Sequence, residues 1–253
     1  MSLTGRHALV TGGSRGIGAA IARALTEAGA RVTIRGRDIA ALRSVVTAGH
    51  AEALARADVT RRADFAAAVE SAVSARGPVD ILVSNAGSVE TAPFLKTDPA
   101  LFARMIEVHL IAAVHGAQLV LPAMKARRSG RIINIASTAA LKGFAYGTAY
   151  TAAKHALLGL TRALALETAA EGVTVNALCP GYAATDLVAN SVETAARKTG
   201  RARADVLADF LRGNPLGRLI EPREIAAAAL FLCSDAAAAV TGQAIAVDGG
   251  ETM

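Results

Sequence analysis

Three residues near the middle of the chain have side chains suited to moving a proton on or off an oxygen atom: Ser137, Tyr150 and Lys154. Tyr150 and Lys154 are four residues apart, so on a helix they share one face. A free phenol titrates at about 10, and a cation one turn away favours the phenolate and brings that pKa closer to neutrality. A nearby serine hydroxyl would hydrogen-bond the oxygen that Tyr150 protonates. On this spacing alone, a core tyrosine beside a snorkelling lysine is the more frequent case, and the rest of the chain reverses that balance.

The segments around these three residues predict a strand, a loop and a long helix. The apolar run 132–135 is typical of a buried strand, whose carboxyl end delivers Ser137. A glycine-containing loop follows, and a helix is predicted over 150–170. Apolar residues surround most of this helix, so we expect its inner face to pack on a sheet and its outer face on another subunit. Cover by the chain's own insertion is the alternative.

Strands and helices alternate along the rest of the chain. Strands are predicted at 7–10, 32–34, 52–57, 80–83, 132–135, 173–178 and 244–247, and helices at 19–28, 40–47, 62–76, 101–124, 150–170, 186–212 and 222–233. The helix at 101–124 is long enough to be two helices end to end. The alternation predicts an α/β fold, a single domain over 1–253 whose doubly wound parallel sheet has helices on both faces. The segment 186–214 is too long for a simple connection and predicts a helical lid.

A glycine-rich turn, 12–18, follows the first predicted strand and precedes a helix. Glycines allow the backbone to approach a pyrophosphate, and the helix N-terminus supplies N–H donors and partial positive charge. Ligands of parallel sheets bind beyond the carboxyl ends of the strands. Asn85, Ser137 and Pro180-Gly181 also lie at such ends, so the sequence predicts a dinucleotide site there.

Composition excludes several classes of function. The formal net charge is +6, but the arginines are scattered and only 4% of residues are aromatic, so no nucleic-acid partner is expected and an anionic small ligand is favoured. Cys179 and Cys233 form no C-x-x-C pair, which predicts neither a metal site nor a disulfide framework and suits the cytoplasm. The N-terminus does not read as a signal peptide, and we expect no apolar run long enough to span a membrane.

These motifs, in order, resemble those of the short-chain dehydrogenases/reductases. The resemblance extends from Thr11 to Gly250 and rests on Thr11-Gly12-x-x-x-Gly16-x-Gly18, Asp58, Asn85-Ala86-Gly87, Ser137, Tyr150-x-x-x-Lys154, Asn176, Pro180-Gly181 and Asp248-Gly249-Gly250. It implies a Rossmann-like domain, a nicotinamide cofactor and a homotetramer. It also implies an oxidoreductase that acts on a ketone or a secondary alcohol.

The resemblance also implies roles for individual residues. Tyr150 would be the acid/base, Lys154 would hold the cofactor ribose and lower the tyrosine pKa, and Ser137 would orient the substrate oxygen. Asp58 would contact the adenine, and Thr185 would face the nicotinamide amide or the phosphates. The expected cofactor contacts are Gly12, Ser14, Arg15, Gly16, Ile17, Gly18, Arg37, Asp58, Val59, Asn85, Ala86, Gly87, Tyr150, Lys154, Pro180, Gly181 and Thr185.

His109 departs from the family pattern, because the family usually has an asparagine at this place, where it helps hold a water beside the active lysine. We include His109 among the catalytic candidates. One interpretation is a replacement that only fills the space of the asparagine. The other is a proton relay that titrates, since histidine changes charge near neutral pH.

The end of the second predicted strand favours NADP(H) over NAD(H). NAD-specific members of this fold place a carboxylate there, which accepts from the ribose hydroxyls and repels a 2′-phosphate. That position aligns with Gly36, and Arg37 and Arg15 could bind the phosphate through charged hydrogen bonds. The alternatives are that Arg37 points to solvent or pairs with Asp38, or that Asp38 itself reaches the ribose.

The segments 130–137 and 152–155 resemble ketoacyl and hydroxyacyl reductases within the family, so we expect a 3-oxoacyl/3-hydroxyacyl pair as substrate. Four lid cations, Arg197, Lys198, Arg201 and Arg203, could meet the phosphates of a coenzyme A thioester or form a solvated surface. The alternatives are another small carbonyl compound, a cyclic ketone or a polyketide. A non-catalytic NAD(P)-binding regulator would be expected to lose Tyr150 or Lys154.

Overall fold

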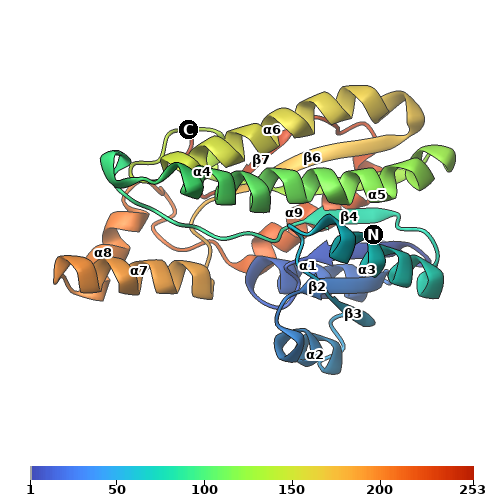
Figure 1. The fold of residues 1–253 in the computed structure, drawn as a ribbon, viewed down its shortest axis with the longest axis horizontal. Coiled ribbons are helices and arrows are strands. Elements are labelled where there is room, and N and C mark those ends of the chain that lie inside the picture. The colour runs from blue at the N-terminus through green and yellow to red at the C-terminus, as the bar shows by residue number, and fades with distance from the viewer. Residues whose placement is uncertain (1) are drawn as a thin grey trace.

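A computed structural model describes residues 2–253 and places seven strands in one parallel sheet (Figure 1). The strands are β1 (His7–Thr11), β2 (Arg31–Gly36), β3 (Ala53–Arg56), β4 (Ile81–Ser84), β5 (Gly130–Ile135), β6 (Val173–Pro180) and β7 (Ala244–Val247). Their order across the sheet is β3-β2-β1-β4-β5-β6-β7. The predicted doubly wound, Rossmann-like α/β fold is confirmed.

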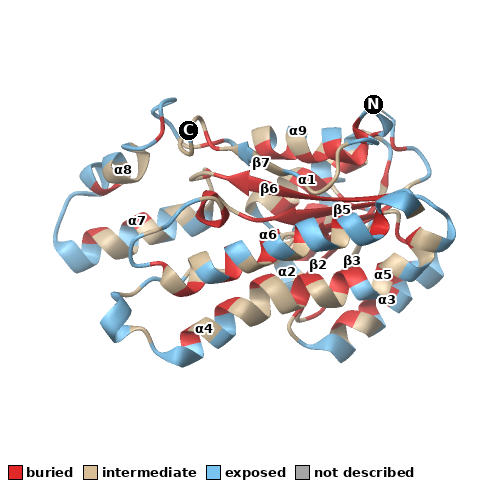
Figure 2. Ribbon diagram, turned by 90° about the horizontal axis from the view of Figure 1, so that it is seen from above, coloured by how far each residue is buried: buried red, intermediate tan, exposed pale blue. Residues whose placement is uncertain are grey.

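Helices cover both faces of this sheet. They are α1 (Gly16–Glu27), α2 (Ile39–Thr47), α3 (Arg62–Arg76), α4 (Pro99–Ile106), α5 (Ala112–Ala126), α6 (Thr148–Thr168), α7 (Asp186–Thr199), α8 (Arg203–Leu211) and α9 (Pro222–Cys233). Strand residues alternate between two cores: Val10 and Val83 pack with α1 and α9, whereas Leu9 and Leu82 pack with α3 and α5. Because both faces are covered, the central strands β1 and β5 are buried along their whole length and are mostly apolar (Figure 2).

The helix predicted over 101–124 consists of two helices joined end to end. A π-helical turn, Glu107–Ile111, connects α4 to α5 without a break, so the rod runs from Pro99 to Ala126, 28 residues. The expectation that no apolar run reaches membrane-spanning length was wrong, because an 18-residue window of this rod has a mean hydropathy of 1.4. Its apolar residues Val120 and Met124 pack on Leu82 of the sheet, as in the core helix of a globular fold.

The predicted lid is two helices rather than one. Gly200, at φ +70, ends α7, and the chain turns back into α8. A small apolar cluster of Val192, Ala196 and Val206 holds α7 against α8. The pair extends beyond the end of the sheet, where most of its residues are exposed or half-buried (Figures 1 and 2).

The topology creates a crevice between β1 and β4. The chain leaves β1 through α1 toward β2 on one side of the sheet, whereas β4 leads through α4 and α5 to β5 on the other. At such a switch point the connections diverge from the carboxyl ends of neighbouring strands, and ligands of this fold class bind there. The segments that follow β1, β4, β5 and β6 therefore form the site.

Candidate active site

The glycine-rich turn after β1 is locked against the segment after β4. The Asn85 side chain donates from Nδ2 to the carbonyl oxygens of Thr11 (3.0 Å) and Gly12 (3.1 Å). A Cβ added to Gly12 would lie 2.8 Å from Asn85 Nδ2, and one added to Gly18 would lie 2.3 Å from the Gly12 oxygen. Neither position accepts a side chain without a shift. Asn85 therefore shapes the turn from which α1 begins.

The N-terminus of α1 fits the pyrophosphate of a dinucleotide. Its first turn contains no acidic residue, and the Arg15 side chain makes no capping hydrogen bond. The first N–H groups of a helix lack partners within the helix and attract anions. Arg15 is exposed, and Ser14 and Ile17 are half-buried at the same turn. Thr185 faces the turn from the start of α7, because a Cβ at Gly16 would lie 3.1 Å from its Cγ2.

Ser137 and Tyr150 lie together at the end of β5 and the first turn of α6. The backbone of Ser137 is extended, and its Oγ accepts from the Ala139 N–H at 3.1 Å. Burial raises the pKa of Tyr150, and the Ser137 hydroxyl beside the phenol opposes this by lowering it. The lowering of this pKa that was expected from Lys154 is therefore not seen: the phenol stays protonated at neutral pH, ready to donate to an oxygen held next to Ser137.

Lys154 is buried one helical turn beyond Tyr150. Its Nζ donates to the Ile135 carbonyl oxygen at 2.8 Å and lies 5.6 Å from the centre of the Tyr150 ring. Burial lowers the pKa of Lys154 to about 7. The ammonium is thus held by the end of β5 rather than by a carboxylate, with its remaining donors toward the crevice. The sequence predicted the shared helix face, but the contact with β5 depends on tertiary packing.

His109 lies in the π-helical turn, between Lys154 and the loop after β4. Its Nε2 donates to the Ser88 carbonyl oxygen at 2.8 Å, which leaves Nδ1 as the bare acceptor nitrogen, buried and without a partner among residues 2–253. The ring meets Tyr150 edge-on, with 5.3 Å between ring centres and 81° between planes. Burial, with a further effect from Lys154, lowers the pKa of His109 to about 3. At this pKa the ring is neutral near pH 7, which favours the space-filling interpretation of His109 over the titrating relay.

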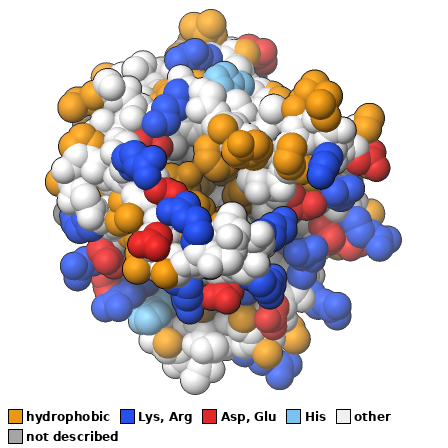
Figure 3. Space-filling model, turned by 90° about the vertical axis from the view of Figure 1, so that its left-hand side faces the viewer, with side chains coloured by type: hydrophobic (Ala, Val, Ile, Leu, Met, Phe, Trp, Pro, Cys, Tyr) orange, Lys and Arg blue, Asp and Glu red, His pale blue; other side chains and the backbone are white. Residues whose placement is uncertain are grey.

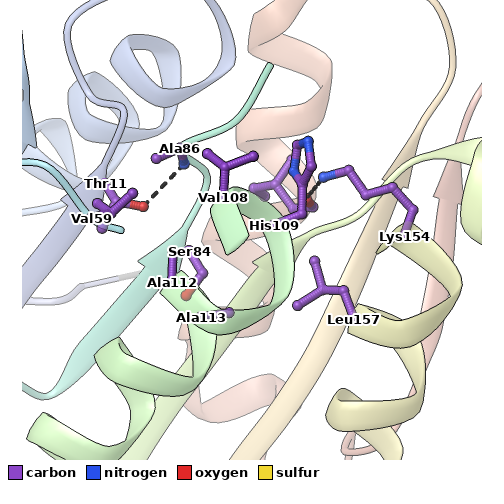
Figure 4. A pocket seen from close by; sticks show the side chains of 11 residues that line it. Thr11, Val59, Ser84, Ala86, Val108, His109, Ala112, Ala113, Lys154 and Leu157 are labelled. Atoms are coloured by element: carbon purple, nitrogen blue, oxygen red, sulfur yellow. Dashed lines mark hydrogen bonds between the residues drawn. The ribbon is translucent and has the colours of Figure 1, made fainter. Parts of the chain in front are cut away.

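A small cavity separates His109 and Lys154 from the end of β1 (Figure 4). Thr11 and Ala86 line one side, joined by a hydrogen bond from the Ala86 N–H to Thr11 Oγ1 (3.1 Å), and Val59 lies beside them. The cavity has a volume of about 10 Å³, on the order of one water molecule. Val59 and Ala86, both expected cofactor contacts, thus line the same cavity as His109 and Lys154.

The adenosine end of the predicted site lies beyond β2. Asp38 is the N-cap of α2, and its Oδ1 accepts from the Ala40 and Ala41 N–H groups, both at 3.1 Å. In the described part of the chain no ion pair joins it to Arg37, which is exposed. Burial tends to raise the pKa of Asp58, but hydrogen bonds from Thr60 and the nearby Arg37 lower it overall. Arg37 and Asp58 therefore flank the same corner.

Sequence reasoning missed a row of three aromatic rings near Tyr150, formed by Phe144, Tyr182 and Phe210. Tyr182 follows Gly181 at the end of β6 and lies between Phe144, 6.5 Å away, and Phe210 of α8, 4.8 Å away between ring centres. Burial, with Glu251 and Tyr150 nearby, raises the pKa of Tyr182 to about 12. The position directly after Pro180-Gly181 was the only available signal.

Asn176, one of the family motifs, has a structural role. Its Nδ2 donates to the Val240 oxygen (2.7 Å) and its Oδ1 accepts from the Gln243 N–H (3.1 Å), which fixes the segment leading into β7. Figure 3 shows a hollow on one face of the molecule, with hydrophobic side chains around it and Lys and Arg side chains nearby. The predicted catalytic and cofactor residues thus converge on one edge.

Comparison with known proteins agrees with this geometry. The family model described as Enoyl-(Acyl carrier protein) reductase matches residues 12–252. The chain is 40% identical over 256 residues to D-beta-hydroxybutyrate dehydrogenase of Cupriavidus necator, covering 98% of each. It is 39% identical over 248 residues to acetoacetyl-CoA reductase of Shinella zoogloeoides, covering 97% of this chain and 98% of that one.

Among solved structures, the fold is similar to that of a single-residue variant of actinorhodin polyketide ketoreductase with NADPH. The TM-score is 0.94 at 35% identity, over 100% of this chain and 99% of the other. The regulator considered from the sequence is therefore set aside. The chain belongs to the short-chain dehydrogenase/reductase family and is an NAD(P)-dependent oxidoreductase of ketones and secondary alcohols.

Proposed function

We propose that this enzyme reduces the 3-oxo group of an acyl thioester, or oxidises the matching 3-hydroxy group. The proposal is carried by the convergence of Ser137, Tyr150 and Lys154 at the sheet edge that also bears the glycine-rich turn. The nicotinamide supplies or accepts a hydride when it is bound. Ser137 holds the substrate oxygen, the Tyr150 phenol gives it a proton in the reductive direction, and Lys154 holds the cofactor ribose.

NADP(H) is the proposed cofactor. Asp38 caps the N-terminus of α2, where one of its carboxylate oxygens accepts hydrogen bonds from two backbone N–H groups. Its carboxylate is therefore poorly placed to accept from a ribose hydroxyl. Gly36 presents no carboxylate, and Arg37 is exposed at the corner that also holds Asp58. A guanidinium there suits a 2′-phosphate through charged, paired hydrogen bonds. Arg15, exposed on the glycine-rich turn, supports the same preference.

The choice of a 3-oxoacyl unit is supported by the names of two relatives. One is a dehydrogenase of a 3-hydroxy acid and the other a reductase of acetoacetyl-CoA, a 3-oxoacyl thioester. Both match nearly their whole length to this chain. A thioester would extend from Tyr150 past the lid, whose α8 contributes Phe210 to the aromatic row beside Tyr182.

Only two of the four lid cations are available to meet the phosphates of coenzyme A. Arg201 is paired with Asp209 (2.6 Å) and Arg203 with Glu193 (3.2 Å). Arg197 and Lys198 are exposed at the end of α7. The excess of four positive charges expected from the sequence is therefore halved by local ion pairs, and the phosphate contact falls to Arg197 and Lys198.

The test compares kcat/KM for a 3-oxoacyl-CoA with that for its N-acetylcysteamine analogue, which lacks the phosphates. Neutralising Arg197 and Lys198 to Gln should lower the ratio of CoA to analogue, more so at low salt. Neutralising Arg201 and Arg203 is the matched control, because the same charge change there removes cations already paired. An equal ratio in all three proteins would remove the lid from coenzyme A binding, and failure to turn over either thioester would refute the proposed substrate.

The proposal extends to assembly and compartment. The outer face of α6 exposes small residues, Ala152, Gly159 and Ala163, next to Leu166, whose side chain is 86% exposed. A face of this kind suits close packing against other copies of the chain, as in a homotetramer. Cys179 and Cys233 are buried free thiols, which suits the reducing cytoplasm.

A further inference from the structure

Glu251, two residues before the last residue Met253, has its side chain buried near the carboxyl ends of the strands. Its side chain is only 8% exposed. The preceding turn is held by Asp248, whose oxygens accept from the Gly250 N–H (2.9 Å), the Thr252 N–H (3.0 Å) and the Thr252 hydroxyl (2.6 Å). The tail is therefore a built turn that carries Glu251 to a defined place, rather than a frayed end.

Only half of the Glu251 carboxylate has a partner. Lys142 Nζ lies 3.1 Å from Oε1 and 3.1 Å from the Glu251 carbonyl oxygen. Oε2 is buried and makes no hydrogen bond with any described residue. Burying a charged oxygen without a donor is unfavourable, and most buried polar atoms in native proteins have a partner. Oε2 is thus a buried acceptor that lacks a donor among the described residues.

The position of Oε2 relates it to the reacting centre. A Cβ at Gly181 would lie 2.9 Å from it, so Oε2 sits against the backbone where β6 ends. The next residue, Tyr182, is close enough to both Glu251 and Tyr150 for each to raise the pKa of its phenol. On the other side, a Cβ at Gly213, just after α8, would be 3.8 Å from Glu251 Cγ. Glu251 therefore lies between the catalytic end of β6 and the end of the lid.

We infer that Glu251 selects substrates that carry a hydrogen-bond donor beyond the reacting carbonyl. The preferred class is a neutral ketone with an O–H or N–H group, which Oε2 accepts, and a carboxylate at that place is repelled. The inference deepens the proposed function and rests on it. Two sources supply such a donor: the amide N–H of the cysteamine arm of an acyl thioester, and the hydroxyl of a hydroxyketone.

The test uses pairs of ketones that differ only in the donor. One pair is the 3-oxobutanoyl thioester of N-acetylcysteamine and the analogue with an ester oxygen in place of the amide N–H. The other is 4-hydroxy-2-butanone and 2-pentanone. We expect kcat/KM of the wild-type enzyme to favour the donor in at least one pair by roughly ten- to a hundredfold, the usual range for a hydrogen bond to a charged group. The pair that shows the preference identifies the source.

Three variants separate substrate binding from anchoring of the tail. In Glu251→Met the preference should fall to about one, whereas Glu251→Gln, which keeps an acceptor oxygen, should retain part of it. Lys142→Met removes the other half of the ion pair but leaves the carboxylate, so its preference for the donor should persist. If the pair only anchors the tail, both methionine variants will lower the melting temperature and leave the preference unchanged, which overturns the inference.

Calorimetric binding of the same ketones in the presence of NADP⁺ gives a readout that does not depend on turnover. A donor preference in binding that is lost in Glu251→Met supports the inference even where a variant is inactive. Wild-type enzyme that turns over these ketones without a donor preference refutes the role of Glu251 alone. Wild-type enzyme that turns over no ketone refutes the proposed function, and the binding ratio still decides the role of Glu251.

Discussion

The imidazole of His109 lies directly against the α-carbon of Gly87. A Cβ added to Gly87 would be 2.4 Å from His109 Cε1 and 2.9 Å from Nδ1. The adjacent ring nitrogen, Nε2, is fixed by its hydrogen bond to the Ser88 oxygen. The residues at positions 87 and 109 therefore depend on each other. Gly87 leaves room for the imidazole, and His109 fills the space between the loop after β4 and Lys154.

Gly87→Ala should destabilise the protein, because the new methyl group cannot fit without displacing the buried His109 ring. Overpacking of this kind is typically unfavourable by about 1–3 kcal/mol. In the double variant Gly87→Ala/His109→Ala the clash is gone, so its loss of unfolding free energy should be smaller than the sum of the two single losses. Urea unfolding of the four proteins measures the coupling, and additive losses would contradict it.

The protein should become less stable as the pH decreases, partly because of His109. The pKa of this histidine is about 3 in the folded state, against an ordinary value of 6.5. Below pH 6.5 the unfolded chain therefore binds the extra proton, and the folded state does not until pH approaches 3. Stability from the neutral ring is present above 6.5 and declines below it by up to about 1.4 kcal/mol per pH unit.

The measurement compares the unfolding free energy of wild type and His109→Asn between pH 7.5 and 4.5. The wild type should lose more stability than the asparagine variant as pH falls, and parallel curves would show that His109 is accessible to protons. The pH profiles of kcat should coincide for these two proteins between pH 6 and 8, since the ring stays neutral there. A profile that flattens in His109→Asn would restore the titrating relay.

Tyr150→Phe should fold and bind cofactor normally but lose most of its turnover, because only the proton-donating hydroxyl is removed. Positioned acid/base catalysis is typically worth ~10²- to 10⁴-fold in rate. Steady-state kinetics gives kcat, and fluorescence titration of NADPH gives the cofactor Kd. Tyr182→Phe is a matched control, since it removes a phenol hydroxyl from the neighbouring ring. A Tyr150→Phe enzyme with nearly unchanged kcat would refute the assignment.

Cofactor preference should follow two neighbouring positions at the end of β2. Arg37→Ala should lower kcat/KM for NADPH by about one to two orders of magnitude and leave that for NADH nearly unchanged. Gly36→Asp should raise the NADH to NADPH ratio, because a carboxylate there accepts from the ribose and repels the 2′-phosphate. The site has room, since a Cβ at Gly36 would meet Leu42 at an ordinary 3.6 Å. A wild-type preference for NADH would refute the NADP(H) proposal.

Leu166→Glu should convert the proposed tetramer into smaller species. A charge on the outer face of α6 would have to be buried between copies, which is strongly unfavourable. Leu95→Glu is the control, because Leu95 lies in a short 3-10 turn away from α6 in the sequence and is 97% exposed. Light scattering after size exclusion measures the mass of each protein. Wild type that elutes as a monomer, or a Leu166→Glu variant of unchanged mass, would rule out this face as the interface.

Much of the fold could be predicted from the sequence, because local residue patterns determine the strands and helices. The boundaries predicted for 62–76, 222–233 and 244–247 coincide with α3, α9 and β7. Alternating strands and helices imply a parallel sheet, and a parallel sheet brings all its carboxyl ends to one edge. The convergence of the glycine-rich turn, Asn85 and the Ser137 segment therefore followed from their positions after strands, before any contact was known.

The sequence by itself determined which side chains lie at the carboxyl ends of the strands. The tertiary structure decided how far these side chains are buried and what their pKa values are. Lys154 is four residues from Tyr150 in any helix, but only packing on β5 buries it and lowers its pKa to about 7. His109 is neutral because residues far along the chain enclose it, and Glu251 reaches the end of β6 across 70 residues of intervening chain. Desolvation and long-range contacts depend on three-dimensional distance, which spacing along the chain does not encode.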